Sequence, residues 1–556
     1  MKIKVSELIV KYIERLGIET IFGMPGAHIL PVYDSLYDSS VKTILAKHEQ
    51  GAAFMAGGCA RASGHISACI TTAGPGATNL VTGIANAYAD KLPVLVITGE
   101  TSTHIFGKGG LQESSGEGGA IDQYALFKGI TRYNKVVERT DYLVNVLNQA
   151  SKILLSSCSG PVLLSFPYNI QKEEVDEEIL EQVKTSRQLY SKIAHQQSSS
   201  AFVELIRQAN NPVIIAGYGC IASGAEQLVE KLSNSLNIPV TTSLKGKGVI
   251  NEDSDLSLGS LGVTSYTNAH DYIQKNADLL IFLGAAFNER TSYLWDKNLL
   301  NGKKIIQVDN SEEQLEKVFT ADIAIKGDIK EVLTNVFLDI DANMLAPKAT
   351  AKYTKFSSQK DESDAGNNFL AFKEKFPLVE AFFNELEKSF TEGIMVFDDN
   401  VIFAQNFFNV SNGNRYYSNS GVSSLGHAIP AAIGARFSVQ KPSFAILGDG
   451  GFQMCCMEIM TAVNYDIPLN IIMFNNSTMG LIRKNQFQQY DKRFINCDFI
   501  NPDYAYLAKS FGVNYKRIEQ TSDLKGMFNE FDFEKQINLV EIMIDKDAFP
   551  TYSSGR

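Results

Sequence analysis

Apolar and polar positions follow two repeating patterns along this chain. VSELIVKYIERLGI (residues 5–18) has apolar residues at helical spacing, whereas LPVLVITGE (residues 92–100) is an apolar run that ends in polar residues. Runs of the second kind recur between helical patterns from one end of the chain to the other. Strands that alternate with helices predict a parallel sheet with helices on both faces.

Two polar stretches divide this pattern into three blocks. Residues 171–200 and 342–368 lack a sustained apolar period and are expected to be linkers, the first of them carrying one helix. The sequence therefore predicts an α/β fold of three doubly wound, parallel-sheet domains. Their expected ranges are residues 1–170, 190–340 and 369–556.

Polar side chains follow two apolar runs in the third block. FAILGD ends in Asp449, and LNIIMF is followed by Asn476. Gly450 and Gly451 are expected to form a tight turn, and Met454–Tyr465 has helical spacing. Because the carboxyl ends of successive parallel strands meet at one sheet edge, a hard cation could bind the two side chains there and share phosphate oxygens.

This stretch resembles the diphosphate-anchoring motif of thiamine diphosphate (ThDP) enzymes, in which GDG precedes NN by a similar interval. The interval is 24 residues here. The resemblance implies that Mg²⁺ is held by Asp449, Asn476 and the backbone carbonyl of Thr478. Taken alone, the motif has another interpretation, in which GDG is a surface turn and NN is the end of a strand. The implied cofactor-binding residues are Gly448, Asp449, Gly450, Gly451, Asn476, Thr478 and Met479.

Composition narrows the class of protein. The 556 residues are 44% hydrophobic and 20% charged, which is ordinary for a globular protein, and the net charge of −11 argues against nucleic-acid binding. No apolar run approaches about 18 residues, and the N-terminus does not have the pattern of a signal peptide, so we expect no membrane span. Seven cysteines without a CxxC motif indicate reduced thiols in the cytoplasm.

The segment HEQGAAFMAGGCARASG places Glu49 between an apolar run and a small-residue helix. If this carboxylate is buried, it needs a hydrogen-bonding or charged partner. The alternative is an ordinary charge at a helix N-terminus, stabilised by the helix dipole. The segment resembles the one that bears the catalytic glutamate of ThDP enzymes. The resemblance implies that Glu49 binds N1′ of the aminopyrimidine and thereby promotes loss of the thiazolium C2 proton, while the cofactor carries the chemistry.

Two further segments resemble cofactor-binding parts of the same family. TTAGPGATN contains Gly74 and Asn79, which are expected against the cofactor. In SNSGVSSLGHAIPAAIGA, the carbonyl of Ser423 is expected to accept from N4′, at a position where relatives usually have a small residue such as glycine. Leu425 is expected to be the apolar wedge between the two rings, with an ordinary core leucine as the alternative.

The residues expected near the substrate resemble those of more than one ThDP enzyme. Ala27 and His28 are similar to a segment of benzaldehyde lyase, and Gln112 matches a glutamine of benzaldehyde lyase and of acetolactate synthases. His28 is expected either to shuttle protons or to be merely structural. Asn485 replaces the tryptophan by which acetolactate synthases select larger acceptors. The implied catalytic residues are Glu49, His28 and Gln112, and the implied substrate residues are Ala27, His28, Gln112, Asn485 and Arg290.

The middle block raises the question of a second cofactor. GYGCIASG reads as a strand, a glycine-rich turn and a helix, which alone is a weak signal. Acetolactate synthases bind FAD through similar segments, of which this chain keeps Arg290 but has Ala286 at an earlier arginine position. FAD, an empty site, and binding of an acceptor carboxylate by Arg290 remain alternatives.

The three-block layout resembles the pyrimidine-binding, middle and diphosphate-binding domains of ThDP enzymes, closest to the acetolactate synthase branch. The resemblance implies a carboligase that decarboxylates a 2-oxo acid, most simply pyruvate, and transfers the acyl unit to a carbonyl acceptor. A 2-oxo acid decarboxylase, a hydroxyketone lyase and a non-catalytic nucleotide-binding regulatory protein are the alternatives. Because this family builds each active site across two subunits, we expect a homodimer or homotetramer.

Overall fold

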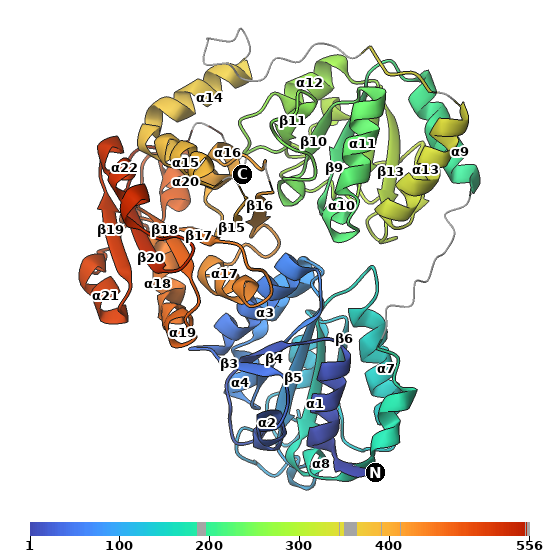
Figure 1. Ribbon diagram of the computed structural model, residues 1–556, viewed down its shortest axis with the longest axis vertical. Helices are drawn as coiled ribbons and strands as arrows, with labels where there is room; N and C mark the ends of the chain where they lie inside the picture. The colour runs from blue at the N-terminus through green and yellow to red at the C-terminus, as the bar shows by residue number, and fades with distance from the viewer. Residues whose placement is uncertain are drawn as a thin grey trace.

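Three six-stranded parallel sheets form the framework of the computed structural model, which describes residues 1–185, 196–343, 345–349, 364–390, 392–411, 413–550 and 552. Each sheet belongs to one block of the chain and is covered by helices (Figure 1). The prediction of three α/β domains is confirmed. In the part of the chain described, no helix combines the length and apolarity needed to cross a membrane.

The N-terminal sheet has the order β3-β2-β4-β5-β7-β6. One core cluster buries the α3 and α5 side of this sheet, and another buries the side covered by α1 and α7. The elements are β2 (Thr20–Gly23), β3 (Lys42–Leu45), β4 (Ser67–Thr71), β5 (Val94–Glu100), β6 (Tyr133–Val136), β7 (Val162–Pro167), α1 (Val5–Arg15), α3 (Glu49–Ser63), α5 (Val81–Ala89) and α7 (Leu143–Leu154).

The middle sheet has a different order, β11-β10-β9-β12-β13-β14. Its order reverses between β9 and β12, so a crevice is expected at the carboxyl ends of these two strands. The elements are β9 (Pro212–Ala216), β10 (Val240–Thr242), β11 (Ser257–Ser260), β12 (Leu279–Leu283), β13 (Lys304–Asp309), β14 (Ile323–Lys326), α9 (Gln196–Gln208), α10 (Tyr218–Ala222), α11 (Glu226–Leu236), α12 (Ala269–Asn276) and α13 (Ile329–Asn343).

The C-terminal sheet, β16-β15-β17-β18-β20-β19, repeats the connectivity of the N-terminal sheet. In both, the second strand lies beside the first on one side and all later strands lie on the other. The elements are β15 (Met395–Asp398), β16 (Arg415–Ser418), β17 (Ser443–Gly448), β18 (Leu469–Asn475), β19 (Asn514–Ile518), β20 (Ile537–Met543), α14 (Asp364–Lys375), α15 (Pro377–Ser389), α16 (Ile402–Phe407), α17 (Ala428–Arg436), α20 (Gly480–Gln489), α21 (Tyr504–Phe511) and α22 (Thr521–Glu530).

The first predicted linker is partly wrong. Strand β8 (Glu174–Asp176) pairs antiparallel with β1 (Lys2–Lys4), and Leu180 and Val183 are buried against the N-terminal domain. These apolar side chains fasten the start of the polar stretch to the first domain. Residues 196–200 of this linker form the start of α9. Residues 186–195, and most of the second linker, residues 350–363, lie outside the described residues.

Helices α3 and α17 pack against each other at the junction of the N-terminal and C-terminal domains (Figure 1). Their backbones approach closely because small residues face each other. A Cβ added at Gly58 would lie 2.1 Å from the carbonyl oxygen of Ala431, and one at Gly434 would lie 2.0 Å from that of Met55. One continuous apolar core therefore joins the two domains.

We expect Gly58→Ala to lower the free energy of unfolding by about 1–3 kcal/mol or more, since the added methyl group meets backbone that cannot rotate away. Gly57→Ala, one position earlier in α3, is the matched control, because a Cβ there meets only Leu92 Cδ1 at 3.6 Å. Higher helix propensity favours this control by about 0.5–1 kcal/mol. Denaturant melts of both variants test the packing, and equal stability would contradict it.

Candidate active site

Asp449 and Asn476 follow neighbouring strands in the C-terminal sheet. Strands β17 and β18 run parallel with Gly448 opposite Phe474, so both side chains emerge at one sheet edge. The N–H of Ser477 donates to Asp449 Oδ2 at 2.7 Å, and Asn501 Nδ2 donates to the same oxygen at 2.8 Å. Burial raises the pKa of Asp449, and these hydrogen bonds oppose the rise.

The donor atoms at this edge suit a hard divalent cation. They comprise one carboxylate, the amide oxygen of Asn476 and the backbone carbonyl of Thr478, whose hydroxyl is engaged with the carbonyl of Cys497 at 2.8 Å. Mg²⁺ prefers such oxygen ligands and commonly keeps positions for phosphate and water. Asn501, which sequence reasoning missed, also donates to Asn475 Oδ1 at 2.8 Å and thereby holds the turn against Asp449.

The glycines after Asp449 do not form the tight turn that was predicted for them. Helix α18 (Asp449–Cys455) begins at the acid itself, so Gly450 and Gly451 lie in its first turn rather than in a tight loop. A Cβ at Gly450 would lie 2.7 Å from Met479 Sδ, and one at Gly451 would lie 2.7 Å from Asp399 Oδ2. Close packing therefore requires both glycines.

The helix predicted over Met454–Tyr465 is also wrong in its start and its continuity. Helical structure already begins with α18, and a 3₁₀ turn, η5 (Cys456–Glu458), separates α18 from α19 (Ile459–Asn464).

A buried acid at the end of β15 shapes the segment that carries Ser423 and Leu425. Asp399 accepts from the N–H of Gly426 at 2.6 Å and from the N–H of His427 at 3.1 Å. Ser423 has φ +62°, a region that favours glycine. Leu425 is half-buried and belongs to none of the core clusters among the described residues.

Asp399 and its neighbour Asp398 were not singled out from the sequence. Burial raises the pKa of Asp398 to about 7 and that of Asp399 to about 6. The sequence pattern that could have identified them is a pair of acids directly after the apolar run IMVF. That pattern marks a strand end at the point where the order of the sheet reverses, between β15 and β17.

Glu49 and Asn79 come together in the N-terminal domain. Glu49 is the first residue of α3 and is half-buried, and its Oε2 accepts from Asn79 Nδ2 at 2.9 Å. The turn in front of it is held from the C-terminal domain. Glu458 accepts from the N–H groups of Lys47 at 3.1 Å and His48 at 3.0 Å. Sequence reasoning missed Glu458.

His28, Gln112 and Gly74 also meet in the N-terminal domain. The N–H of His28 donates to Thr72 Oγ1 at 3.3 Å, and Thr72 Oγ1 donates to Gln112 Oε1 at 3.5 Å. Burial lowers the pKa of His28, and a hydrogen bond with the Gln112 side chain raises it in part. Neighbouring Ala27 is exposed. The benzaldehyde lyase-like residues thus form one cluster.

The other expected substrate residues lie in different domains. Asn485 is on α20 of the C-terminal domain, and Arg290 is in the middle domain. Within the described chain, no hydrogen bond or ion pair joins Glu49 or Asn79 to Asp449 or Asn476. The two halves of the expected cofactor site are therefore not linked directly within one subunit.

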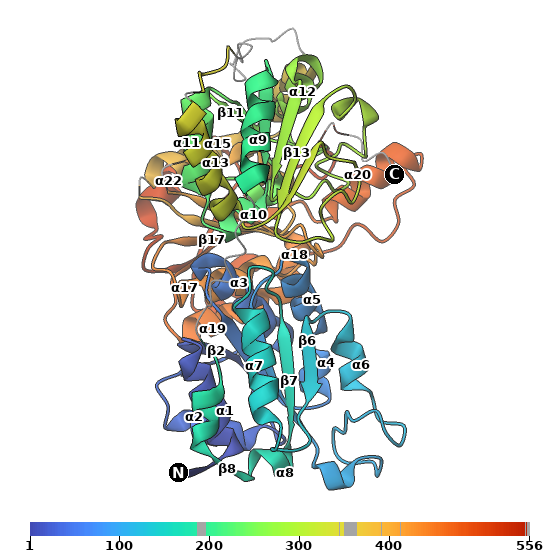
Figure 2. The ribbon, with the colours of Figure 1, turned by 90° about the vertical axis from the view of Figure 1, so that its right-hand side faces the viewer.

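The strand ends of the middle domain face the N-terminal domain (Figure 2). A cleft of about 1040 Å³ there is lined by residues of all three domains. Gly219 and Gly284, which both line it, pack backbone to backbone at its wall. Its lining includes cations, acids and the expected cofactor loop, namely Lys91, Lys245, Arg290, Asp309, Asp328 and Ser423.

A buried ionic cluster beside this cleft ties the three domains together. Asp90 of the N-terminal domain pairs with Arg61 from α3 and with Lys245 from the middle domain. Arg61 also donates to the carbonyl oxygen of Ser418 in the C-terminal domain at 2.8 Å. The cluster holds the start of the Ser423 segment against both other domains.

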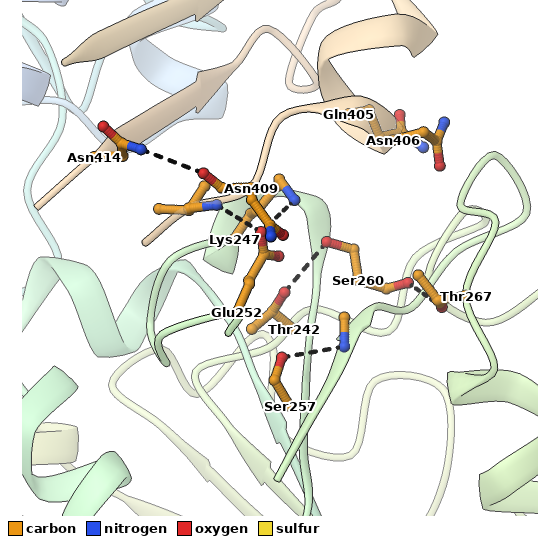
Figure 3. Close-up of polar contacts among 12 residues, drawn as sticks. Thr242, Lys247, Glu252, Ser257, Ser260, Thr267, Gln405, Asn406, Asn409 and Asn414 are labelled. Atoms are coloured by element: carbon orange, nitrogen blue, oxygen red, sulfur yellow. Dashed lines mark hydrogen bonds and ion pairs between the residues drawn. The ribbon is translucent and has the colours of Figure 1, made fainter. Parts of the chain in front are cut away.

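A second polar interface joins the middle and C-terminal domains (Figure 3). Lys247 Nζ pairs with Glu252 Oε2 at 2.6 Å, and the same oxygen accepts from the N–H of Val410 at 2.8 Å. From α16, Gln405 Nε2 donates to Thr264 Oγ1 at 2.6 Å. The Gln405 contact holds the turn at residues 262–265, which lines the cleft.

Three family models match successive parts of the chain. The thiamine pyrophosphate enzyme N-terminal TPP binding domain matches residues 3–125, the central domain matches residues 199–336, and the C-terminal TPP binding domain matches residues 399–542. Each model matches part of a different domain, and together they include strands of all three parallel sheets.

Curated relatives align over nearly the whole length. A probable acetolactate synthase large subunit of Methanocaldococcus jannaschii is 34% identical, covering 99% of this chain and 94% of the relative. One from Methanococcus aeolicus is 32% identical, covering 98% and 92%. An acetolactate synthase large subunit of Corynebacterium glutamicum is 28% identical, covering 99% and 88%. The chain belongs to the thiamine pyrophosphate (ThDP) enzyme family, in its acetolactate synthase-like branch.

Proposed function

We propose that this enzyme decarboxylates pyruvate and transfers the resulting acyl unit to a carbonyl acceptor, giving a hydroxyketone or an acetohydroxy acid. The observation that carries the proposal is the similarity to acetolactate synthase large subunits over nearly the full length of the chain. The pairing of Glu49 with Asn79 at the head of α3 supports a working catalytic site rather than a regulatory protein.

Glu49 is the proposed proton-handling residue. Thiamine diphosphate, when bound, supplies the carbanion chemistry of the reaction. The Glu49 carboxyl holds the proton that is shared with the aminopyrimidine, and Asn79 fixes the orientation of that carboxyl through its 2.9 Å hydrogen bond. Gly74, Ser423 and Leu425 are proposed to shape the pocket for the rings.

The diphosphate end is proposed to depend on Mg²⁺. Asp449, Asn476 and the carbonyl of Thr478 would hold the ion, and their oxygen donors fit it. Gly448, Gly450, Gly451 and Met479 would lie against the diphosphate. Gly450 and Gly451 already pack so tightly that a side chain at either position would displace Met479 or Asp399.

Substrate recognition is proposed to involve Ala27, His28 and Gln112 on one side and Asn485 and Arg290 on the other. Burial lowers the pKa of His28, which favours the neutral imidazole near neutral pH. The side chain of Asn485 is smaller and more polar than the tryptophan expected in branched-chain synthases. That difference supports an acceptor other than the usual larger 2-oxo acid.

We propose a homodimer or homotetramer in which each cofactor lies between Glu49 of one subunit and Asp449 of another. The resemblance to ThDP enzymes, which build each active site across two subunits, supports this arrangement. All seven cysteines are free thiols, which is in keeping with a cytoplasmic enzyme.

The interdomain cleft is the proposed site of FAD. Its volume, the backbones of Gly219 and Gly284 after β9 and β12, and the cations Lys91, Lys245 and Arg290 support an anionic dinucleotide. The visible absorption spectrum of the purified protein tests this part. A spectrum without flavin bands, before and after incubation with FAD, would argue against FAD binding. It would favour the alternative in which Arg290 binds the carboxylate of the acceptor.

Product analysis tests the central proposal. Purified protein is incubated with ThDP, Mg²⁺ and pyruvate, alone and with a panel of aldehydes and ketones, and the products are identified by NMR. Acetolactate or a cross-ligation product is the expected result. Acetaldehyde alone would favour a 2-oxo acid decarboxylase, and cleavage of added hydroxyketones would favour a lyase.

A further inference from the structure

A buried carboxylate lies beneath the loop that carries Gln112. Glu100 is the last residue of β5 and has no exposed surface. Its Oε1 accepts from the N–H of Thr101 at 2.8 Å and from the N–H of Ser114 at 3.0 Å, whereas its Oε2 has no partner among the described residues. A buried acid is costly, so its presence at this strand end calls for a role.

Ser114 connects Glu100 to two residues of the proposed site. Its Oγ accepts from the N–H of Gly74 at 3.0 Å and donates to the carbonyl oxygen of Gln112 at 3.1 Å. Glu100 fixes the backbone of Ser114, and the Ser114 hydroxyl fixes the backbones on either side of it. The carboxylate is therefore two hydrogen bonds away from both Gly74 and Gln112.

Gln112 needs this support because its backbone is strained. Its φ is +55°, in the left-handed region that costs a residue with a side chain roughly 1 kcal/mol or more. Gly74, with φ +60°, leaves just enough room for it, since a Cβ at Gly74 would lie 3.0 Å from Gln112 Cβ. The Gln112 side chain in turn reaches Thr72 and His28.

A second acid holds the other end of the same loop. Glu113 accepts from the N–H groups of Gly107 at 2.5 Å, Gly109 at 3.0 Å and Gly110 at 2.8 Å. Its charge and, above all, burial raise the pKa of Glu100 to about 7. Glutamine is therefore a close mimic of the neutral form of Glu100, and it keeps an oxygen that can accept from Ser114.

We propose that Glu100 is a positioning residue that acts through Ser114 to hold Gln112 against Gly74, and thereby sets how an acceptor is presented to the reacting centre. The proposal rests on the proposed carboligase function. Glu100 itself touches neither substrate nor cofactor in this scheme. It governs the partition of the bound acyl unit between transfer to the acceptor and release as free aldehyde.

A double-mutant cycle tests whether Glu100 acts through Gln112. The ratio of ligation product to free aldehyde is measured at saturating ThDP, Mg²⁺ and pyruvate for wild type, Glu100→Ala, Gln112→Ala and the double variant. Each single change is expected to lower the ratio by about tenfold to a hundredfold, as small displacements of a positioning group do. The double variant is expected to be no worse than Gln112→Ala.

Three further variants separate positioning from general damage to the fold. Glu100→Gln should restore most of the ratio, and Ser114→Ala should lower it like Glu100→Ala. Glu117→Ala, at an exposed acid of the same loop, should match wild type. The proposal would be overturned if the double variant lowered the ratio by the product of the two single effects. It would also be overturned if Glu100→Ala had the same ratio as wild type.

Hydrogen exchange at residues 107–116 tests the proposal without turnover. Glu100→Ala should speed exchange there relative to wild type, Glu100→Gln should not, and unchanged exchange in Glu100→Ala would overturn the inference. If wild type turns over no 2-oxo acid, the proposed function fails, and the exchange result still decides whether Glu100 orders the Gln112 loop.

Discussion

Glu49→Gln is expected to lower kcat by about 10²–10⁴-fold at saturating ThDP, because glutamine keeps the shape of the side chain but cannot hold or release a proton. The hydrogen bond from Asn79 Nδ2 can still form with the amide oxygen, so the start of α3 should be preserved. Steady-state turnover of pyruvate measures the loss, and thermal unfolding measures whether the fold is retained.

The matched control for this change is Glu7→Gln. Glu7 is also a half-buried acid in the first turn of a helix of the N-terminal domain, but it lies on α1, far along the chain from the proposed site. It should retain the wild-type kcat. Full activity of Glu49→Gln with saturating ThDP would remove Glu49 from the catalytic role.

Asp449→Asn is expected to weaken ThDP binding in the presence of Mg²⁺ by on the order of 100-fold, which corresponds to about 2.7 kcal/mol. The amide keeps the size of the carboxylate but removes the one negative charge among the proposed metal ligands. Calorimetric titration of ThDP at a fixed Mg²⁺ concentration measures the change.

Raising the Mg²⁺ concentration should recover part of the affinity of Asp449→Asn. Asp491→Asn, at an exposed acid of the same domain, should bind ThDP as wild type does. If Asp449→Asn binds with unchanged affinity at limiting Mg²⁺, the metal site lies elsewhere.

Strands at the centre of each sheet could be predicted from the sequence, and several edge strands could not. The runs that form β5, β12 and β18 are buried on both faces and read as continuous apolar stretches. Edge strands such as β6 (YNKV) and β19 (NYKRI) are buried on at most one face. Their polar side chains interrupt the apolar pattern by which a strand is predicted. Burial on both faces is what gives a parallel strand its sequence signal.

The residues of the candidate site divide in the same way. Asp449, Asn476 and Glu49 stand directly after apolar runs or at a helix start, where a local pattern points to a ligand. Asp399 and Glu458 were missed, because each binds backbone amides of segments remote in sequence. Main-chain amides leave no trace in an amino-acid sequence, so acceptors that serve them look like ordinary acids.

The contact of Glu458 with the amides in front of Glu49 has a consequence for the newly made protein. It joins residues 410 and 411 positions apart, so the turn before Glu49, the proposed catalytic glutamate, cannot be completed until most of the chain has left the ribosome. Domains generally fold in order of synthesis. The small-residue face of α3, which packs on α17 in the complete protein, therefore stays uncovered until the C-terminal domain has been made. Docking of α17 and Glu458 couples the completion of synthesis to the onset of activity.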